Sequence, residues 1–165
     1  MAPEFVEPPD VVCQLGGNHY GLAVKRLQSL DRFEERFSKC CKQIENSKIP
    51  GYAVMDLSLA VNPGNRPISA SIDDHDMHGL TSKWCQETFV PKHEWMKKTQ
   101  RGREVRGLII LLHFIKYVPK EGIWGLYSYT WGYSLSPDNQ KRRREFSAFF
   151  NRFVKGLATP ASQGL

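Results

Sequence analysis

Apolar and polar residues alternate most regularly between residues 127 and 135. Large apolar side chains occupy the odd positions and small ones the even positions: Tyr127, Tyr129, Trp131, Tyr133 and Leu135 are separated by Ser128, Thr130, Gly132 and Ser134. A period of two with aromatic residues on one side is typical of a half-buried β-strand. The sequence therefore predicts a strand over residues 123–135, and the simplest interpretation is that its aromatic side chains face a core under the last helix of the chain.

Three further segments also alternate in the way strands do. Residues 52–61 and 68–72 flank a turn-forming segment, 62–65, and so predict a β-hairpin. The segment 105–118 predicts a long strand, and because its centre is apolar on both faces we expect it to lie in the middle of the sheet. Residues 120–122 then predict the turn that leads into the aromatic strand.

Two segments show the spacing of amphipathic helices. In the first, residues 20–45, the apolar positions recur in steps of three and four, at Leu27, Leu30, Phe33, Phe37, Cys40, Cys41 and Ile44. The second follows Ser136 and Pro137, a residue type favoured at the N-cap and one favoured at the first helical position. The apolar face of this second helix is expected at Phe146, Phe149, Phe150, Phe153 and Leu157.

These elements predict one α+β domain over residues 20–157, built on an antiparallel β-sheet with an N-terminal amphipathic helix and a C-terminal basic amphipathic helix. Residues 73–84 predict a short helical or irregular piece between the two pairs of strands. Residues 1–19 are rich in proline and glycine and predict a flexible arm, and residues 158–165 predict a flexible tail. The length suffices to bury a hydrophobic core.

The formal net charge of +6 is concentrated in the second half of the chain. One basic segment surrounds residues 97–106 and another opens the last helix; together they supply the expected polyanion contacts Lys97, Lys98, Arg101, Arg103, Arg106, Lys141, Arg142, Arg143 and Arg144. Such an excess favours nucleic acid or an anionic membrane surface as a partner, because each neutralised phosphate releases condensed counterions. The alternative is a solvated face that only keeps the protein in solution.

The densest group of potential metal ligands is residues 73–78, which contain three aspartates and two histidines. Their spacing matches no strong zinc or calcium pattern, so we expect a solvated polar loop and no metal site. The glycines form no phosphate-binding motif, and no nucleophile stands beside a recognisable base. We therefore expect a protein without enzymatic activity and without a cofactor.

Several features bear on where the protein works. The four cysteines do not suggest a disulfide framework, since Cys40 and Cys41 are adjacent on a predicted helix. No apolar segment follows Met1, and the longest apolar run is too short to cross a bilayer. These features favour a soluble protein made in a reducing compartment.

The middle of the chain resembles the thirty-kilodalton superfamily of plant-virus cell-to-cell movement proteins. Residues 51–61 resemble its first core strand, and residues 68–72, followed by Asp73 and Asp74, resemble the next strand with its terminal aspartate. Later strands of the family have counterparts in residues 89–91, 108–115 and the aromatic strand. The resemblance implies a jelly-roll-like β core, cooperative binding of single-stranded RNA, and action in the host cytoplasm, at the cell periphery or at plasmodesmata.

Two alternatives stay open. Asn65–Pro67 and Gly125–Tyr127 also resemble rhabdovirus-type matrix proteins, which implies condensation of a nucleocapsid at an anionic membrane surface. A viral suppressor of RNA silencing that recognises duplex RNA by its shape is the third class. Exposed aromatic side chains near the basic segments could stack on unpaired bases. Self-association is a further expectation.

Overall fold

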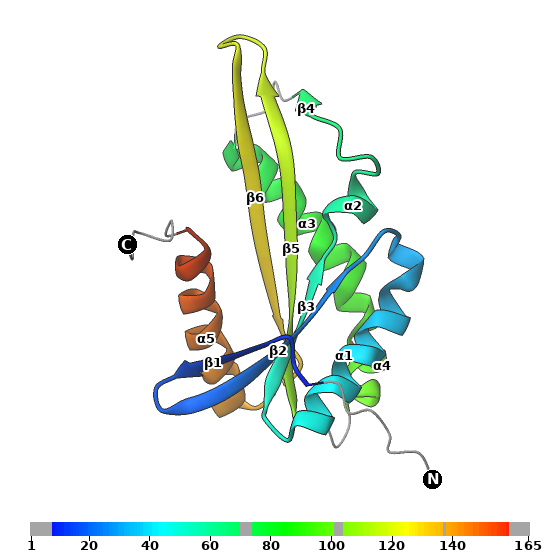
Figure 1. The fold of residues 1–165 in the computed structure, drawn as a ribbon, viewed down its shortest axis with the longest axis vertical. Coiled ribbons are helices and arrows are strands. Elements are labelled where there is room, and N and C mark those ends of the chain that lie inside the picture. Colours follow the sequence, from blue (N-terminus) through cyan, green and yellow to red (C-terminus); the bar gives the residue numbers. More distant parts are fainter. Residues whose placement is uncertain (1–7, 70–73, 101–103, 137, 159–165) are drawn as a thin grey trace.

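The fold is described here from a computed structural model, over residues 8–69, 74–100, 104–136 and 138–158. Its strands are β1 (Val11–Leu15), β2 (Asn18–Arg26), β3 (Gly51–Asp56), β4 (Ile68–Ser69), β5 (Val105–Val118) and β6 (Ile123–Ser134). Its helices are η1 (Leu30–Arg32), α1 (Phe33–Ser47), α2 (Ser58–Val61), α3 (Asp74–Phe89), η2 (Val90–Lys92), α4 (His93–Thr99) and α5 (Gln140–Ala158). Figure 1 shows their arrangement around the two longest strands, β5 and β6.

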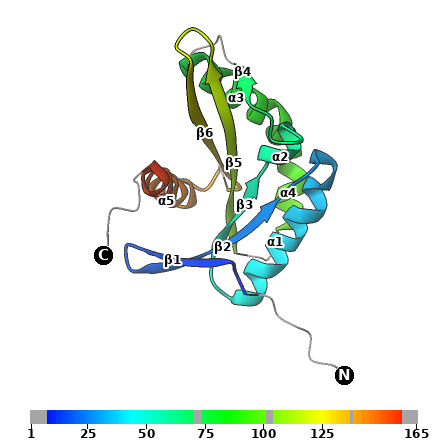
Figure 2. The same ribbon diagram turned by 45° about the horizontal axis from the view of Figure 1, so that its top comes forward.

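The strands form one mixed sheet that curls into a half-barrel, so the α+β class is confirmed and the antiparallel jelly-roll-like core is wrong. β2, β3 and β5 run parallel to one another, while β1 pairs antiparallel with β2 and β6 antiparallel with β5. The short β4 is also parallel to β5. Since β6 pairs along nearly all of β5, β3 and β4 must share the opposite edge of that strand. Figure 2 shows the curl of the sheet.

The predicted hairpin of residues 52–61 and 68–72 is also wrong. β3 ends at Asp56, residues 58–61 form the one-turn helix α2, and β3 and β4 each pair with β5 instead of with each other. Alternation indicated a strand correctly for residues 52–56 and wrongly for residues 58–61, and it contains no information about which distant strand becomes the partner. Of the predicted second strand, residues 70–72 lie outside the described part of the chain.

The N-terminal part differs most from expectation. Residues 11–15 form strand β1 although we expected a flexible arm, and residues 20–26 of the predicted helix belong to β2. β2 is buried on both faces, with Leu22 under α5 and Ala23 under α1, which removes the alternation that would have marked it as a strand. Of the predicted helix over residues 20–45, residues 33–45 lie in the α-helix α1. In α1, the buried face contains Phe33, Phe37, Cys40, Cys41 and Ile44.

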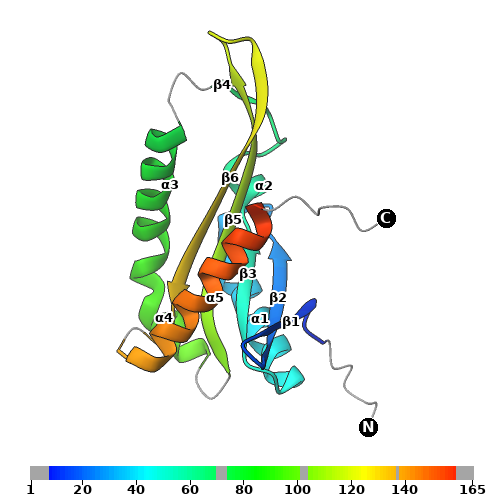
Figure 3. The ribbon, with the colours of Figure 1, turned by 90° about the vertical axis from the view of Figure 1, so that its left-hand side faces the viewer.

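Helices cover both faces of the sheet, as Figure 3 shows. α1, α3 and α4 lie on one face and enclose the larger core, which includes Phe37, Phe89 and Met96. α5 lies on the other face, where its phenylalanines pack against Tyr20, Tyr52 and neighbouring residues of β2, β3 and β5. Because successive side chains of a strand point to opposite faces, each central strand contributes to both cores.

The aromatic residues of β6 face α3 and not the last helix. Tyr127 and Trp131 are buried; the Tyr127 ring lies beside His78, and the Trp131 ring is 5.9 Å from that of Phe89. The expectation that these side chains belong to a core is thus confirmed, while the helix that covers them was wrongly assigned. The small even-numbered residues of β6 lie instead on the α5 face. A Cβ atom on Gly132 would stand only 2.6 Å from the Phe150 ring, so this glycine permits α5 to approach.

α5 begins at Gln140, later than predicted. The side chain of Asn139 accepts a hydrogen bond from the Arg142 backbone N–H at 3.0 Å, which is the contact of an N-cap residue. Pro137 lies outside the described residues. The predicted apolar face is confirmed where its side chains are described, since Phe146 and Phe149 are buried and Phe150 and Phe153 are half-buried.

Candidate nucleic-acid interface

The two basic segments meet at one end of the molecule. α4 ends close to the start of α5, because Lys97 of α4 pairs with Asp138, just before α5, at 4.0 Å. The first turn of α5 also lies close to the start of β5, since Arg142 is 4.0 Å from Glu104, the residue before β5. Figure 3 shows α4 and the start of α5 at the same end of the sheet. We call this surface the basic end and define it by Lys97, Lys98, Lys141, Arg142, Arg143 and Arg144.

Most of these cations are accessible. Lys97, Lys98, Lys141, Arg143 and Arg144 are exposed, and Arg142 is half-buried. This agrees with the geometry of a helix, in which four consecutive residues sweep through more than one turn and cannot share one stripe. The predicted contacts Arg101 and Arg103 lie outside the described residues.

Arg106 has a different position from the other predicted contacts. Its side chain is only 20% exposed and lies between two carboxylates, with Nη2 at 2.8 Å from Glu104 and Nη1 at 4.0 Å from Glu145. It therefore ties the start of β5 to α5. This position gives Arg106 a structural role beside the basic end, while its contact with a polyanion stays a prediction.

The cations of α5 stand where a helix favours anions. Unpaired N–H groups give a helix N-terminus a partial positive charge, and the first turn of α5 contains no acidic residue. Lys141 to Arg144 therefore add positive charge to an end that is already positive. The arrangement lowers helix stability slightly and raises the attraction for a polyanion, whose binding relieves the repulsion.

The aromatic residues of β6 do not serve this surface. Tyr127 and Trp131 are buried, and the half-buried Tyr133 makes a hydrogen bond of 2.9 Å from its hydroxyl to Nδ1 of His93. Burial raises the pKa of Tyr133, with Glu94 adding a smaller effect in the same direction. Among the β6 aromatics, Trp124 is exposed, but it lies at the start of β6, beside the β5–β6 turn. Figure 1 shows that turn at the opposite end of the two strands from α4.

A second group of cations was missed by the sequence analysis. Arg26, Arg32 and Arg36 line a polar cleft of about 250 Å³ where β2 leads into α1. Two of them have acidic partners: Arg26 Nε is 2.7 Å from Asp56, and Arg32 is 3.0 Å from Glu35. The charge of this part of the chain is balanced over its length, so counting charges by segment did not reveal the cluster.

Asp56 is the anchor of that region. Its carboxylate accepts hydrogen bonds from the Ser58 backbone N–H at 3.0 Å, from the Ser58 hydroxyl at 2.6 Å, and from Arg26 at 2.7 Å. Burial alone would raise the pKa of Asp56, but the Ser58 and Arg26 hydrogen bonds outweigh burial and hold it below its usual value. Ser58 in turn accepts a hydrogen bond from the backbone N–H of His113 in β5. The carboxylate thus joins the ends of β2 and β3 to the middle of β5.

This network predicts a loss of stability in acid. A carboxyl whose pKa is lower in the folded state contributes stability above its unfolded pKa of about 3.9, and the contribution is lost as the pH falls through the folded pKa. We expect Asp56→Asn to lower the free energy of unfolding by about 1–3 kcal/mol at pH 7 and by progressively less as the pH falls through the lowered pKa of the folded parent, where its carboxyl becomes protonated too. Urea midpoints measured between pH 2 and pH 7 test this, with Asp138→Asn, whose side chain is 90% exposed, as the control. An equal loss at every pH would show that the charge of Asp56 contributes nothing.

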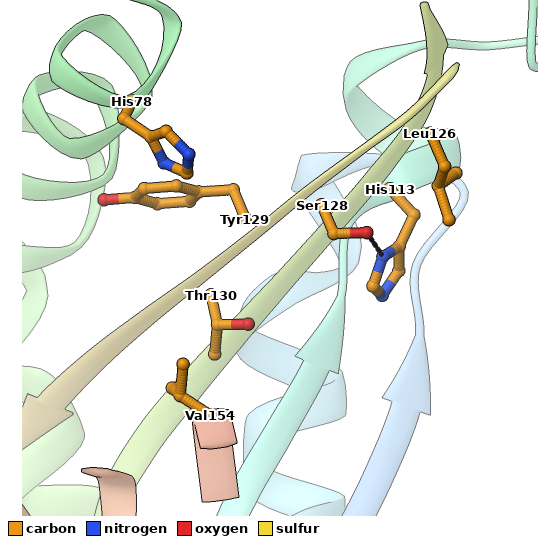
Figure 4. Close-up of a pocket in the computed structure, with 7 residues that line it drawn as sticks. All are labelled: His78, His113, Leu126, Ser128, Tyr129, Thr130 and Val154. Carbon is orange, nitrogen blue, oxygen red and sulfur yellow. Dashed lines mark hydrogen bonds between the residues drawn. The ribbon is translucent and has the colours of Figure 1, made fainter. Parts of the chain in front are cut away.

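A cleft of about 390 Å³ lies along the outer edge of β6. Its lining comes from both faces of the strand: Tyr129 and His78 on the α3 side, His113 and Leu126 on the other, with Val154 of α5 below (Figure 4). His78, from the histidine- and aspartate-rich segment, packs against the rings of Tyr127 and Tyr129. In the part of the chain that the structure describes, no three acidic, histidine or cysteine side chains are placed to share a metal ion.

Comparison with protein-family models, with curated proteins and with solved structures finds no match to this chain. The search for membrane-crossing segments found no helix of sufficient length and apolarity among the described residues.

Proposed function

We propose that this protein is a non-enzymatic nucleic-acid-binding protein whose basic end contacts the phosphate backbone. The observation that supports the proposal is the convergence of cations from two segments, around residues 97 and 142, that are distant in sequence. A polyphosphate chain binds more tightly to a surface with several cations, because each neutralised phosphate releases condensed counterions. The contacts are made to phosphates and not to bases, so binding should depend little on nucleotide sequence.

The three exposed cations in the first turns of α5, Lys141, Arg143 and Arg144, provide the test. Replacing Lys141, Arg143 and Arg144 together by alanine should weaken the binding of a labelled single-stranded oligoribonucleotide of about 20 nucleotides, longer than the sites of most small single-strand-binding domains. The plot of log affinity against log salt concentration should become shallower by about 2, because each lost phosphate contact removes about 0.7 from the slope for single strands. Fluorescence anisotropy at several salt concentrations measures both quantities.

A control variant that loses the same net charge elsewhere tests whether the position of the removed cations decides their effect on binding. Lys39, Lys42 and Lys83 are exposed on α1 and α3, and their joint replacement by alanine should leave the salt slope unchanged. Far-UV circular dichroism must show that both variants are folded. Equal affinity and slope for the α5 variant and the parent would place the contact elsewhere, with the cleft of Arg26, Arg32 and Arg36 as the next candidate. A duplex of the same sequence, measured in parallel, shows which form is preferred.

Cell-to-cell movement of a viral genome stays a narrower proposal within this one. It rests on the resemblance of residues 51–135 alone, and the jelly-roll core that the resemblance implied is not the fold of this chain. A fluorescently tagged copy in plant cells tests it: punctate foci at the cell wall support movement, and a nuclear or diffuse distribution contradicts it.

A further inference from the structure

β6 forms an open edge of the sheet. Among the described strands it pairs with β5 alone, in an unbroken register from Ile123 opposite Val118 to Ser134 opposite Gly107. A strand in this position has an outer row of backbone N–H and C=O groups that can pair with another strand. The cleft described above runs beside Leu126 and Thr130 of this strand, between His78 of α3 and Val154 of α5 (Figure 4).

The sequence of β6 lacks the usual protection of an edge strand. Natural edges are made short, bulged, charged or proline-containing so that they do not pair with other chains. β6 is 12 residues long and contains no charged residue and no proline. The opposite edge of the sheet, β1, has only five residues. β6 is therefore the edge that is suited to receive another strand.

The outer half of β6 also presents apolar side chains to solvent. Ile123 is 54% exposed, Trp124 61% and Leu126 70%, while Ile115 lies opposite Leu126 on β5 and is 37% exposed. Ile123, Trp124 and Leu126 belong to the first part of β6, next to the β5–β6 turn, and Figure 1 shows this turn at the outer end of the hairpin. Apolar side chains flanking an unpaired backbone edge add burial to the hydrogen bonds of strand addition.

The distribution of charge favours a second copy of this chain as the occupant. Because β6 is uncharged, two copies can pair through it without opposing like charges. In antiparallel pairing centred near Leu126, the two basic ends point in opposite directions and lie roughly 50 Å apart, at about 3.3 Å per residue. That distance is several times the Debye length of about 8 Å at physiological salt, so the positive ends do not repel each other. Parallel pairing would place them side by side.

We propose that the protein forms a symmetric dimer by antiparallel pairing of β6 with β6 of a second copy, which joins the two sheets into one. Each copy uses the same surface, as two-fold symmetry requires. Pairing centred near Leu126 takes in only about residues 123–129 of each β6, so the association is weak and should appear at micromolar concentrations or above. The dimer would present two basic ends facing away from each other.

Sedimentation equilibrium from about 1 μM to about 1 mM, a range that covers weak association, should show a reversible monomer–dimer equilibrium. Leu126→Lys and Leu126→Glu should each weaken dimerisation at least tenfold, because like charges meet near the symmetry axis. An equimolar mixture of the two variants should dimerise again, since opposite charges then face each other. Val61→Lys, an exposed apolar position on α2, should dimerise as the parent does.

Amide hydrogen exchange identifies the mode of pairing. At high protein concentration, every second amide of β6 should gain protection, because only the outward-facing N–H groups acquire new partners. A parent protein that stays monomeric up to about 1 mM, or a dimer that both Leu126 variants leave intact, would overturn the proposal. The outcome is separable from that of nucleic-acid binding, since the variant lacking Lys141, Arg143 and Arg144 should still dimerise.

Discussion

Gly51→Ala is expected to unfold or strongly destabilise the protein. A Cβ atom at this position would lie 2.1 Å from the backbone carbonyl oxygen of Gly21 and 2.5 Å from Cδ1 of Ile44. Gly21 and Gly51 are direct neighbours in β2 and β3, and the Gly51 N–H donates to the carbonyl oxygen of Glu104 at 2.9 Å. The clash is therefore with backbone that is fixed on both sides, and it cannot be relieved by turning a side chain. We expect a loss of about 3 kcal/mol or more, at the upper end of overpacking costs.

Gly79→Ala is the matched control for this substitution. Gly79 lies in α3, and apart from its chain neighbours and the backbone of its own helix no atom comes within 4 Å of the position that its Cβ would occupy. Because alanine is the better helix former, the same change should here raise the free energy of unfolding by about 0.5–1 kcal/mol. Urea or thermal unfolding of the two variants should give shifts of opposite sign. Equal stability of the Gly51 variant and the parent would show that β2 and β3 are not packed as closely as described.

Phe149→Ala is expected to detach the basic helix from the sheet. The Phe149 ring is buried, stacked 4.0 Å from the ring of Tyr52 and 5.4 Å from that of Tyr20, measured between centroids. Removing a buried phenylalanine side chain costs about 3–5 kcal/mol, because the lost contacts add to an unfilled cavity. Each kcal/mol lowers the melting temperature of a protein of this size by about 2–4 °C. Calorimetry should therefore show a drop of about 6–20 °C.

Phe153→Ala, one turn later on the same helix, gives the comparison. Phe153 is half-buried at the rim of the same cluster, so its loss should cost less than half as much. If α5 docks through Phe149, nucleic-acid binding should weaken in the Phe149 variant near its melting temperature and stay normal in the Phe153 variant. Similar costs for the two substitutions would mean that no single ring dominates the docking of α5.

The sequence predicted those strands in which both the alternation of side chains and the bounding turn can be read within the segment itself. β5 has the predicted bounds, and β6 ends one residue before its predicted end, because alternation and the turn at Gly122 mark both. β2 was not predicted, since burial on both faces hides its period and Leu27 and Leu30 happen to extend the helical spacing of α1. The parallel pairing of β3 with β5 was not predicted either, because it depends on contacts across the whole of α2, α3 and α4.

The candidate site was predictable to a similar degree. The exposure of Lys141, Arg143 and Arg144 followed from helical geometry and the apolar face of α5. The role of Arg106 did not, because its partners Glu104 and Glu145 come together only when α5 docks on the sheet. The edge of β6 needed the topology as well: an alternating strand does not reveal whether it has one neighbour or two.

The position of β5 in the chain has a consequence during protein synthesis. β3 is complete at Asp56, but its neighbour β5 begins only at Val105, so at 5–20 residues per second the two are separated by roughly 3–10 s of translation. During that interval β2, α1 and β3 can assemble, while the side of β3 that later pairs with β5 is still open. The exposed segment of β3 is Tyr52–Met55, which is apolar throughout. Until β5 leaves the ribosome, the nascent chain thus has a strand whose backbone groups are unpaired along one edge and which is prone to aggregate. This is the interval in which the chain would most need a chaperone.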